Sequence, residues 1–300
     1  MRLLHLQILI MKNKKLFGTL CGILAAICYG TNNFGAVNLK LLGMGVNSTL
    51  FYRFSLAWVI IAVVMMLRKE SVKVTRKEFG TLSMLGILFA LSSLSLYLSF
   101  NHMDSGIAST ILFVYPVMTA ALMAFFFKEK ITYPTLTALL LSIVGVVLLD
   151  WNGGADARLS TLGVILVLVS ALTYAVYIIV MDRGNLQMSP FKINFYVLAY
   201  CTLGQLIYSL IIQQPIVMPQ GVAWFYVGWL ALVPAILALM LMVYAAKYVG
   251  STVTAILGAL EPLTAVVIGL AVFGESFSMN LVFGIVLILS SVCIIALKKK

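Results

Sequence analysis

Long apolar stretches follow one another along almost the whole chain, and short polar segments separate them. A helix that crosses the hydrocarbon core of a bilayer, about 30 Å thick, needs roughly 20 mostly apolar residues. The stretches are apolar on all sides, which favours helices over the alternating strands of a membrane barrel. The pattern predicts ten membrane-spanning helices, at residues 16–38, 48–67, 79–100, 105–127, 134–149, 160–181, 191–212, 221–246, 251–273 and 280–297.

The composition supports this interpretation. Of the 300 residues, 63% are hydrophobic and 10% are charged, and the mean hydropathy is +1.11. Soluble domains contain about 45–50% apolar and about 25% charged residues. We therefore expect an all-α integral membrane protein with no soluble domain attached. The cysteines fall inside predicted spans, and we interpret them as small apolar residues rather than a disulfide framework: Cys21, Cys28, Cys201 and Cys293.

The net charge of +11 is explained by where the basic residues lie. Of the 20 Lys and Arg residues, 17 fall on one side of the predicted spans, only Lys40 and Arg158 fall on the other, and Arg53 lies inside a span. Cytoplasmic connections carry the excess of Lys and Arg in membrane proteins. The distribution predicts that both termini are cytoplasmic, including an N-terminal segment at residues 1–15, and it does not indicate nucleic-acid binding. Met11 is the alternative to Met1 as the start of translation.

The chain contains an inverted repeat. A shift of 146 residues places FVYPVMTAALMAFFFKE (113–129) on ALEPLTAVVIGLAVFGE (259–275), so that Pro116 meets Pro262 and Glu129 meets Glu275. The predicted halves, residues 16–151 and 160–297, each contain five spans, and an odd number makes the second copy enter the membrane from the opposite side. Inverted repeats are typical of secondary transporters, whose substrate site lies near the membrane midplane between the halves.

Several segments resemble one known family over nearly the whole chain. They are GTLCGILAAICYGTNNFGAVN (18–38), FYRF (51–54), GVILVLVSALTYAVYIIVMDR (163–183) and the two Pro-to-Glu blocks. These segments are similar to EamA-type members of the drug/metabolite transporter superfamily, although the sequence at the end of the first block reads KEK (128–130), with a lysine where a glycine usually precedes the glutamate.

The resemblance implies ten helices in two inverted five-helix repeats and a cavity lined mainly by helices 1, 3, 4, 6, 8 and 9. It also implies transport of small metabolites, often amino acids and often outward, across the plasma (inner) membrane. It leaves the substrate open.

Glu261 is the most informative single residue. At a rise of about 1.5 Å per residue it lies about 15 Å into its span, close to the midplane. An ionised carboxylate costs about 2.5–3.5 kcal/mol there, so Glu261 should face a cavity, meet a partner or be protonated. Two interpretations have equal weight: a carboxyl that exchanges protons or holds a substrate ammonium, and a structural Glu that bonds to a neighbouring helix.

Pro262 and Pro116 add matched irregularities. Proline has no N–H, so Pro262 should leave the carbonyl of Gly258 without its helical partner, and Pro116 should do the same for Leu112. Such breaks are tolerated at membrane depth where they line a cavity or where neighbours satisfy them. A kink that only aids packing is the alternative.

Arg53 is the other charge inside a span. Long cationic side chains near helix ends usually extend to the interface, and we expect this of Arg53. The alternative is a pairing between Arg53 and Glu261.

Further candidates are polar and aromatic residues three or four positions apart, which share a helix face. Tyr115 occupies the position that Glu261 holds in the second repeat. Packing between helices is the alternative for each residue alone. As a group they predict an aromatic, weakly polar substrate-binding cavity made by Tyr29, Asn33, Ser93, Tyr97, Tyr115, Tyr174, Tyr177, Trp229, Tyr244 and Glu261.

Missing motifs narrow the function. The sequence has no P-loop, no nucleophile elbow and no cluster of ligands around His5 or His102. We therefore expect no enzyme activity, no cofactor and no metal. One carboxylate and one arginine are a poor match for phosphates, which favours neutral, zwitterionic or cationic substrates.

The leading hypothesis is a proton-linked or facilitative transporter of small amphiphilic metabolites, amino acids first. A passive channel, a multidrug or nucleoside exporter, and a membrane-embedded sensor are the alternatives. The expected partners are a small-molecule substrate and the lipid bilayer, and the oligomeric state is left open, a monomer included.

Overall fold

The computed structural model describes residues 2–103, 108, 111–150, 160–272 and 279–297. All the regular elements in these ranges are helices. Seven of the spans are at least 18 residues long and apolar enough to cross a membrane, and three shorter apolar helices supply the others. The prediction of an all-α protein with ten spans is confirmed, and we number the spans 1 to 10 in chain order.

The first half contains α1 (Arg2–Gly30) and α2 (Asn32–Leu41) in span 1, followed by α3 (Val46–Leu67), α4 (Arg76–Ser99), α6 (Tyr115–Phe127) and α7 (Tyr133–Asp150). The second half contains α8 (Thr161–Arg183) and α9 (Pro190–Ile212). Span 8 follows as α10 (Ala223–Leu230), the π-helical segment η1 (Ala231–Leu237) and α11 (Ala238–Val249). The last spans are α12 (Ser251–Leu257) with α13 (Leu260–Val272), and α14 (Met279–Leu297).

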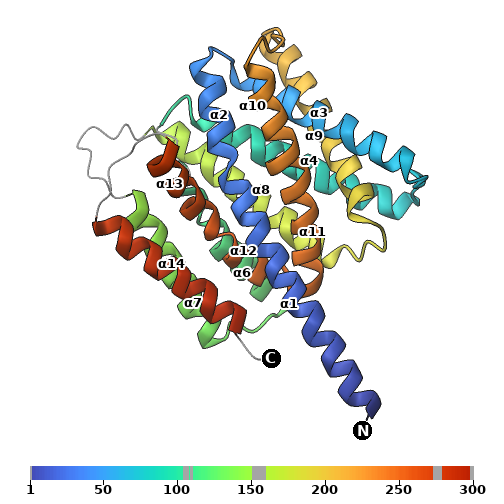
Figure 1. Cartoon of the computed structure of the whole chain (residues 1–300), viewed down its shortest axis with the longest axis vertical. Helices are drawn as coiled ribbons and strands as arrows, with labels where there is room; N and C mark the ends of the chain where they lie inside the picture. The colour runs from blue at the N-terminus through green and yellow to red at the C-terminus, as the bar shows by residue number, and fades with distance from the viewer. Residues whose placement is uncertain (1, 104–107, 109–110, 151–159, 273–278, 298–300) are drawn as a thin grey trace.

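Some boundaries differ from the prediction. Helix α1 begins at Arg2, well before the predicted start of span 1, and its first turns project from the bundle (Figure 1). Span 8 contains a wide π-helical segment around Pro234, because a proline inside a helix cannot donate the usual backbone bond. Some residues of the predicted spans, repeat and basic clusters lie outside the described ranges: Met1, the predicted start of span 4 at Ser105, Arg158, Glu275 and Lys298 to Lys300.

Helix packing follows the inverted repeat. Among the most extensive contacts, α1 packs on α11 and α4 packs on α8, and exchanging the two halves converts one pair into the other. Helices α3 and α9 are each other's counterparts and pack together, as do α7 and α14 at one side of the bundle (Figure 1). The pairs α6 with α8 and α13 with α1 are related in the same way. The two halves therefore interlock, and the core lies between them.

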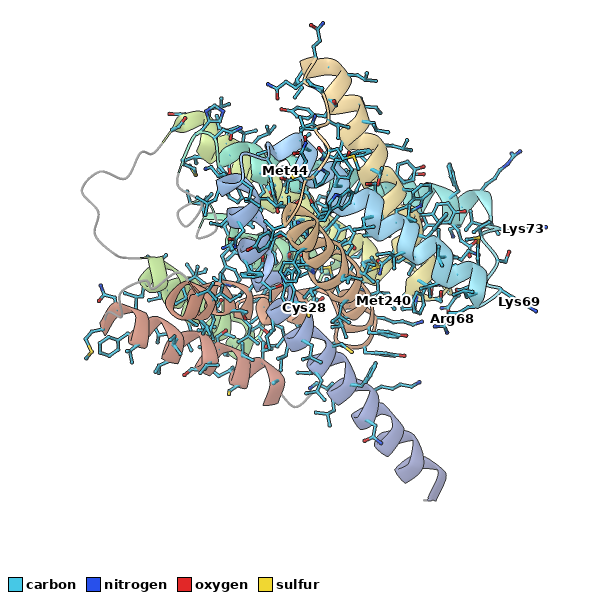
Figure 2. The ribbon with its side chains drawn as sticks, turned by 45° about the horizontal axis from the view of Figure 1, so that its top comes forward. Cys28, Met44, Arg68, Lys69, Lys73 and Met240 are labelled. Carbon is cyan, nitrogen blue, oxygen red and sulfur yellow. The ribbon has the colours of Figure 1, made fainter. Side chains whose placement is uncertain are left out.

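The basic residues gather where several helices end. Figure 2 shows Arg68, Lys69 and Lys73 at the end of α3, far from Met44, which precedes that helix. The Tyr196 hydroxyl donates to the carbonyl of Val72 at 2.6 Å, which joins this end to the start of α9. We call the helix ends that carry these residues, together with Lys128, Arg183, Lys192 and Lys247, the basic face.

Three of the four cysteines are buried inside helices, and Cys293 is exposed on α14. Large apolar side chains such as Leu24 and Val63 are exposed on the outside of the bundle. An outer surface of this kind suits contact with lipid hydrocarbon rather than water.

Candidate functional site

Three helix breaks meet at one pocket between the two halves. Span 1 is interrupted at Thr31, span 4 at residues 113–114 and span 9 at Gly258 and Ala259. The residues beside these breaks line the pocket together with part of α4. We call it the central pocket, and its lining consists of Tyr29, Gly30, Asn32, Asn33, Leu96, Phe100, Leu112, Phe113, Tyr115, Glu261, Pro262 and Ala265.

The break in span 9 has a defined hydrogen-bond pattern. The amide of Ala259 donates to the carbonyl of Ile256 at 3.0 Å, and the amide of Glu261 donates to the carbonyl of Gly258 at 2.9 Å. Bonds to the third residue back are those of a 3₁₀ turn. The prediction that Pro262 leaves the Gly258 carbonyl unbonded was therefore wrong, because the chain tightens and supplies a nearer donor.

The break in span 4 is built similarly. The amide of Val114 donates to the carbonyl of Ile111 at 3.1 Å, and the amide of Val117 donates to that of Val114 at 3.0 Å. Helix α6 then begins at Tyr115, with buried Pro116 in its first turn, where a missing N–H costs little. Pro262 occupies the equivalent place near the start of α13 and itself lines the pocket.

Gly258 makes the close contact between the two breaks possible. A Cβ added at this glycine would lie 1.7 Å from the hydroxyl oxygen of Tyr115 and 2.9 Å from the carbonyl oxygen of Ala255. The Tyr115 hydroxyl thus occupies the space that the Cβ of any residue other than glycine would need at position 258. Sequence reasoning missed Gly258 as a site residue, although a glycine four positions before a proline in an apolar helix was a usable signal.

An aromatic cluster lies behind Tyr115. The ring of Tyr174 meets that of Tyr115 edge to face at 4.9 Å and stacks on Tyr177 at 6.0 Å. Phe89 contacts Tyr177 at 5.1 Å. The hydroxyls of Tyr29 and Tyr177 are buried and have no hydrogen-bond partner among the described residues. Tyr29 borders the pocket, whereas Tyr174 and Tyr177 support it from behind.

Glu261 is half-buried in the first turn of α13 and faces the central pocket. The N-terminal end of a helix stabilises a negative charge, which favours a carboxylate at this position. Helix α1 touches the same turn, since a Cβ at Gly30 would lie 2.5 Å from the Glu261 carbonyl oxygen. Within the described ranges Glu261 forms no ion pair.

Arg53 is buried, with only 4% of its surface exposed. The prediction that it extends to the interface was wrong, because acceptors on other helices meet it inside the bundle. Its Nη1 donates to Asn32 Oδ1 at 2.7 Å and to the Tyr97 hydroxyl at 3.2 Å, and Tyr97 donates to the same Asn32 oxygen at 3.1 Å. The alternative of a direct ion pair with Glu261 is also not observed.

The structure brings some of the predicted binding residues together and separates others. Tyr29, Asn33, Tyr115 and Glu261 line the central pocket directly. Tyr97, Tyr174 and Tyr177 form its support. Asn32 and Gly30 line it as well, and the helical-spacing rule did not select them.

The three other predicted residues lie away from this pocket. Ser93 is half-buried on α4 and does not reach it. Trp229 on α10 packs edge to face against Phe34 at 5.5 Å. Tyr244 borders a second pocket at the basic face, beside Asp182 and Lys247.

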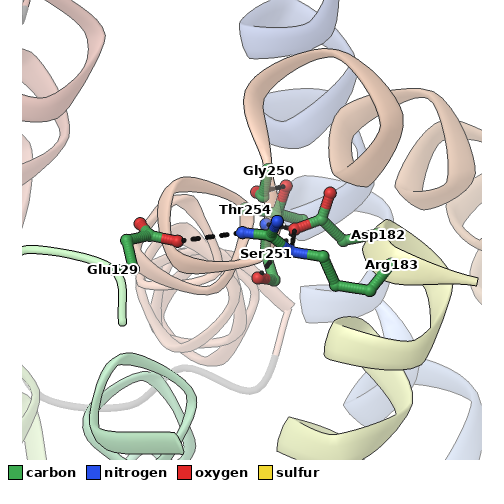
Figure 3. Close-up of polar contacts among 6 residues, drawn as sticks. All are labelled: Glu129, Asp182, Arg183, Gly250, Ser251 and Thr254. Carbon is green, nitrogen blue, oxygen red and sulfur yellow. Dashed lines mark hydrogen bonds and ion pairs between the residues drawn. The ribbon is translucent and has the colours of Figure 1, made fainter. Parts of the chain in front are cut away.

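A polar network at the basic face connects three helix ends (Figure 3). The Asp182 carboxylate accepts the amide N–H and the hydroxyl of Ser251, each at 3.0 Å, at the start of α12. Arg183 lies 3.4 Å from Glu129 and 3.5 Å from the Asp182 carboxylate. The network joins the end of span 4 to the start of span 9 through the end of α8, so the two broken helices are linked outside the pocket as well as within it.

Comparisons with known proteins agree with this architecture. The sequence profile described as the EamA-like transporter family matches residues 16–150 and 161–297. An uncharacterized transporter of Archaeoglobus fulgidus is 29% identical over 214 residues, which cover 71% of this chain and 75% of the relative. An uncharacterized transporter of Synechocystis is also 29% identical, over 71% of this chain and 65% of its own length. One crystal structure superposes with a TM-score of 0.76 over 92% of this chain and 95% of its own, at 16% identity, which is a similarity of fold.

Proposed function

This chain belongs to the EamA-like transporter family, and from that premise we propose that it carries small amphiphilic metabolites, amino acids first, by alternating access. The observation that carries the proposal is the central pocket, which combines three helix breaks with the carboxylate of Glu261. Broken helices around a site at the repeat interface are the arrangement that secondary transporters use to bind substrate.

Alternating access is supported by the origin of the pocket walls. Spans 1, 3 and 4 of the first half and span 9 of the second contribute to one lining. A rocking motion of one half against the other would change access to such a pocket without dismantling either half. The 3₁₀ turns before Pro116 and Pro262 are the places where the backbone can absorb the required change in angle.

The lining supports a neutral, zwitterionic or cationic cargo. Tyr29, Phe113 and Tyr115 supply aromatic surface, and Asn32 and Asn33 supply amides. Phosphate groups are usually held by several cations. Arg53 is the one cation near this pocket among the described residues, so phosphorylated metabolites fit it poorly.

We further propose that Glu261 links transport to protons. A carboxyl group that faces the pocket can exchange a proton or hold a substrate ammonium as access alternates. The distribution of Lys and Arg favours a cytoplasmic basic face, and the family resemblance favours outward transport across the plasma (inner) membrane.

Counterflow in liposomes tests this proposal. The purified protein is reconstituted, loaded with a pool of unlabelled amino acids and exposed to the same compounds in labelled form, with and without a pH gradient. Transient accumulation of label indicates a carrier. Faster uptake or greater accumulation of label when the pH gradient is imposed indicates proton linkage. Flux without counterflow would indicate a passive channel. Counterflow of drugs or nucleosides but of no amino acid would reject the proposed cargo.

A further inference from the structure

Arg53 is a buried cation without an acidic partner in the part of the chain that the structure describes. It forms no ion pair among the described residues, and its Nε atom is buried without a hydrogen-bond acceptor. Taking an unpaired charge out of water is costly, so buried charges are normally paired or bind an oppositely charged group. The acceptors that do meet Arg53, on Asn32 and Tyr97, are neutral. The structure therefore contains a positive charge whose counter-charge the described residues do not supply by direct contact.

Arg53 also determines how the amide of Asn32 is oriented. A guanidinium can only donate hydrogen bonds, so the Asn32 atom at 2.7 Å from it must be the oxygen. Tyr97 donates to the same oxygen and strengthens that assignment. The amide NH₂ of Asn32 must then be the other edge of the group. It has no hydrogen-bond partner among the described residues, and Asn32 lines the central pocket.

The pocket thus has two chemically different poles. Asn32 offers N–H donors backed by the charge of Arg53, and Glu261 offers a carboxylate. Charged groups bind donors or acceptors of opposite charge with bonds roughly twice as strong as neutral ones. A zwitterion satisfies both poles at once, whereas an amine or a carboxylate alone satisfies one.

We infer that Asn32, held in place by Arg53 and Tyr97, binds the carboxylate of the substrate while Glu261 binds its ammonium, so that the central pocket selects zwitterionic amino acids over the corresponding amines. This inference rests on the proposed transport function and adds the basis of its selectivity. Asn32 is the binding residue, and Arg53 is a positioning residue that acts through it.

The test compares three ligands of one skeleton: an amino acid, its carboxamide and its decarboxylated amine. Apparent affinity is measured by competition in counterflow and by thermal stabilisation of the purified protein. Asn32→Asp keeps an acceptor for Arg53 but replaces the donor edge with negative charge. Arg53→Gln removes the positioning charge, and Arg53→Lys keeps it. Asn38→Ala is the matched control, because Asn38 lies on the same helix and its amide bonds to the Phe34 carbonyl.

In the wild type we expect the amino acid to bind about tenfold or more tightly than the carboxamide and the amine, the usual effect of a hydrogen bond to a charged group. Asn32→Asp should abolish or reverse this preference, Arg53→Gln should reduce it, and Arg53→Lys should retain part of it. Asn38→Ala should leave it unchanged.

An unchanged preference in folded Asn32→Asp and Arg53→Gln proteins would overturn the inference, as would a wild type that prefers the amine. If none of the three ligands is bound or transported, the proposed amino-acid function itself is wrong, and the inference falls with it. Loss of preference in the Asn32 and Arg53 variants alongside retained counterflow of the amine would support it specifically.

Discussion

Spans 4 and 9 occupy equivalent places in the two repeats, and each is interrupted just before a proline, but the side chains at the two breaks differ. In each, a 3₁₀ turn precedes a proline, and the residue directly before that proline lines the central pocket. That residue is Tyr115 in span 4 and Glu261 in span 9. Both halves place a 3₁₀ turn before a proline, whereas the residue beside that proline differs in its side-chain chemistry.

The surroundings of the two residues differ accordingly. Tyr115 is 2% exposed, with its hydroxyl against Gly258 and its ring against Tyr174. Glu261 is half-buried and open to the pocket. Span 4 therefore provides a packed aromatic support, and span 9 provides the charge. A second carboxylate in place of Tyr115 would oppose the first, because like charges in one site disfavour each other's ionisation.

The largest effect is expected from removing the charge of span 9. Glu261→Gln should abolish any dependence of transport on the pH gradient and leave the protein folded. The amide has nearly the same shape as the carboxyl group, but it cannot release or take up a proton in this pH range. Tyr115→Phe, the matching change in span 4, should retain the dependence. Counterflow in liposomes at several imposed gradients measures both. Equal proton coupling in Glu261→Gln and the wild type would exclude Glu261 as the coupling residue.

The contact between the two breaks can be disrupted by one methyl group. Gly258→Ala should lower the free energy of unfolding by about 1–3 kcal/mol, the usual cost of overpacking, because its Cβ would overlap the Tyr115 hydroxyl. Denaturant unfolding in detergent measures the change.

Two further variants show whether that loss comes from the predicted overlap. Combining Gly258→Ala with Tyr115→Phe should recover part of the loss, since the hydroxyl is removed while the ring carbon at 3.0 Å stays. Gly228→Ala is the control: no atom lies within 4 Å of the added carbon, so stability should be unchanged or higher by about 0.5–1 kcal/mol. No recovery in the double variant would place the strain elsewhere.

The prolines test whether both breaks act as hinges. Pro262→Ala should slow turnover severalfold while changing substrate affinity little, because a restored backbone bond stiffens the turn while the aromatic, amide and carboxylate groups of the lining stay in place. Pro116→Ala should slow turnover to a similar extent if span 4 also bends. It should slow turnover less if only span 9 bends. Exchange rates and binding affinities measured on the same preparations separate the two effects. Normal turnover in both variants would assign the prolines to packing alone.

The smallest effects are expected at the basic face, where the same two spans are linked. Asp182→Asn weakens a charge-assisted contact with the amide at the start of α12, and losses at helix caps are typically about 0.5–2 kcal/mol. Glu129→Gln breaks an exposed ion pair, which contributes about 0–1 kcal/mol. Denaturant unfolding at low and high salt should show that Asp182→Asn lowers the free energy of unfolding more than Glu129→Gln does. The effect of Glu129→Gln on that free energy should depend more strongly on salt. The reverse order would mean that span 4 depends more on this network than span 9.

Sequence reasoning found the spans reliably because bilayer thickness dictates the length of an apolar helix, and that length is visible in the apolar runs. It also identified the inverted repeat and the pocket residues Tyr29, Asn33, Tyr115 and Glu261. It did not anticipate the π-helical segment of span 8, since a proline alone does not specify how a helix accommodates it.

Helical spacing shows which residues share a face, but it does not say where that face points. Tyr244 and Ser93 were therefore grouped with residues that the fold places elsewhere. Rotation of a helix about its axis depends on the neighbours it packs against, and those neighbours are distant in sequence.

The fold class, the ten spans and the repeat could be read from the chain alone, because they follow from local hydrophobicity and from internal similarity. The surroundings of Arg53 could not, since its partners Asn32 and Tyr97 are 21 and 44 positions away on other helices. The contact between Tyr115 and Gly258 likewise joins the two repeats across the bundle. Hydrophobicity directs a segment into the membrane, whereas the meeting of side chains from separate helices is decided only when those helices pack.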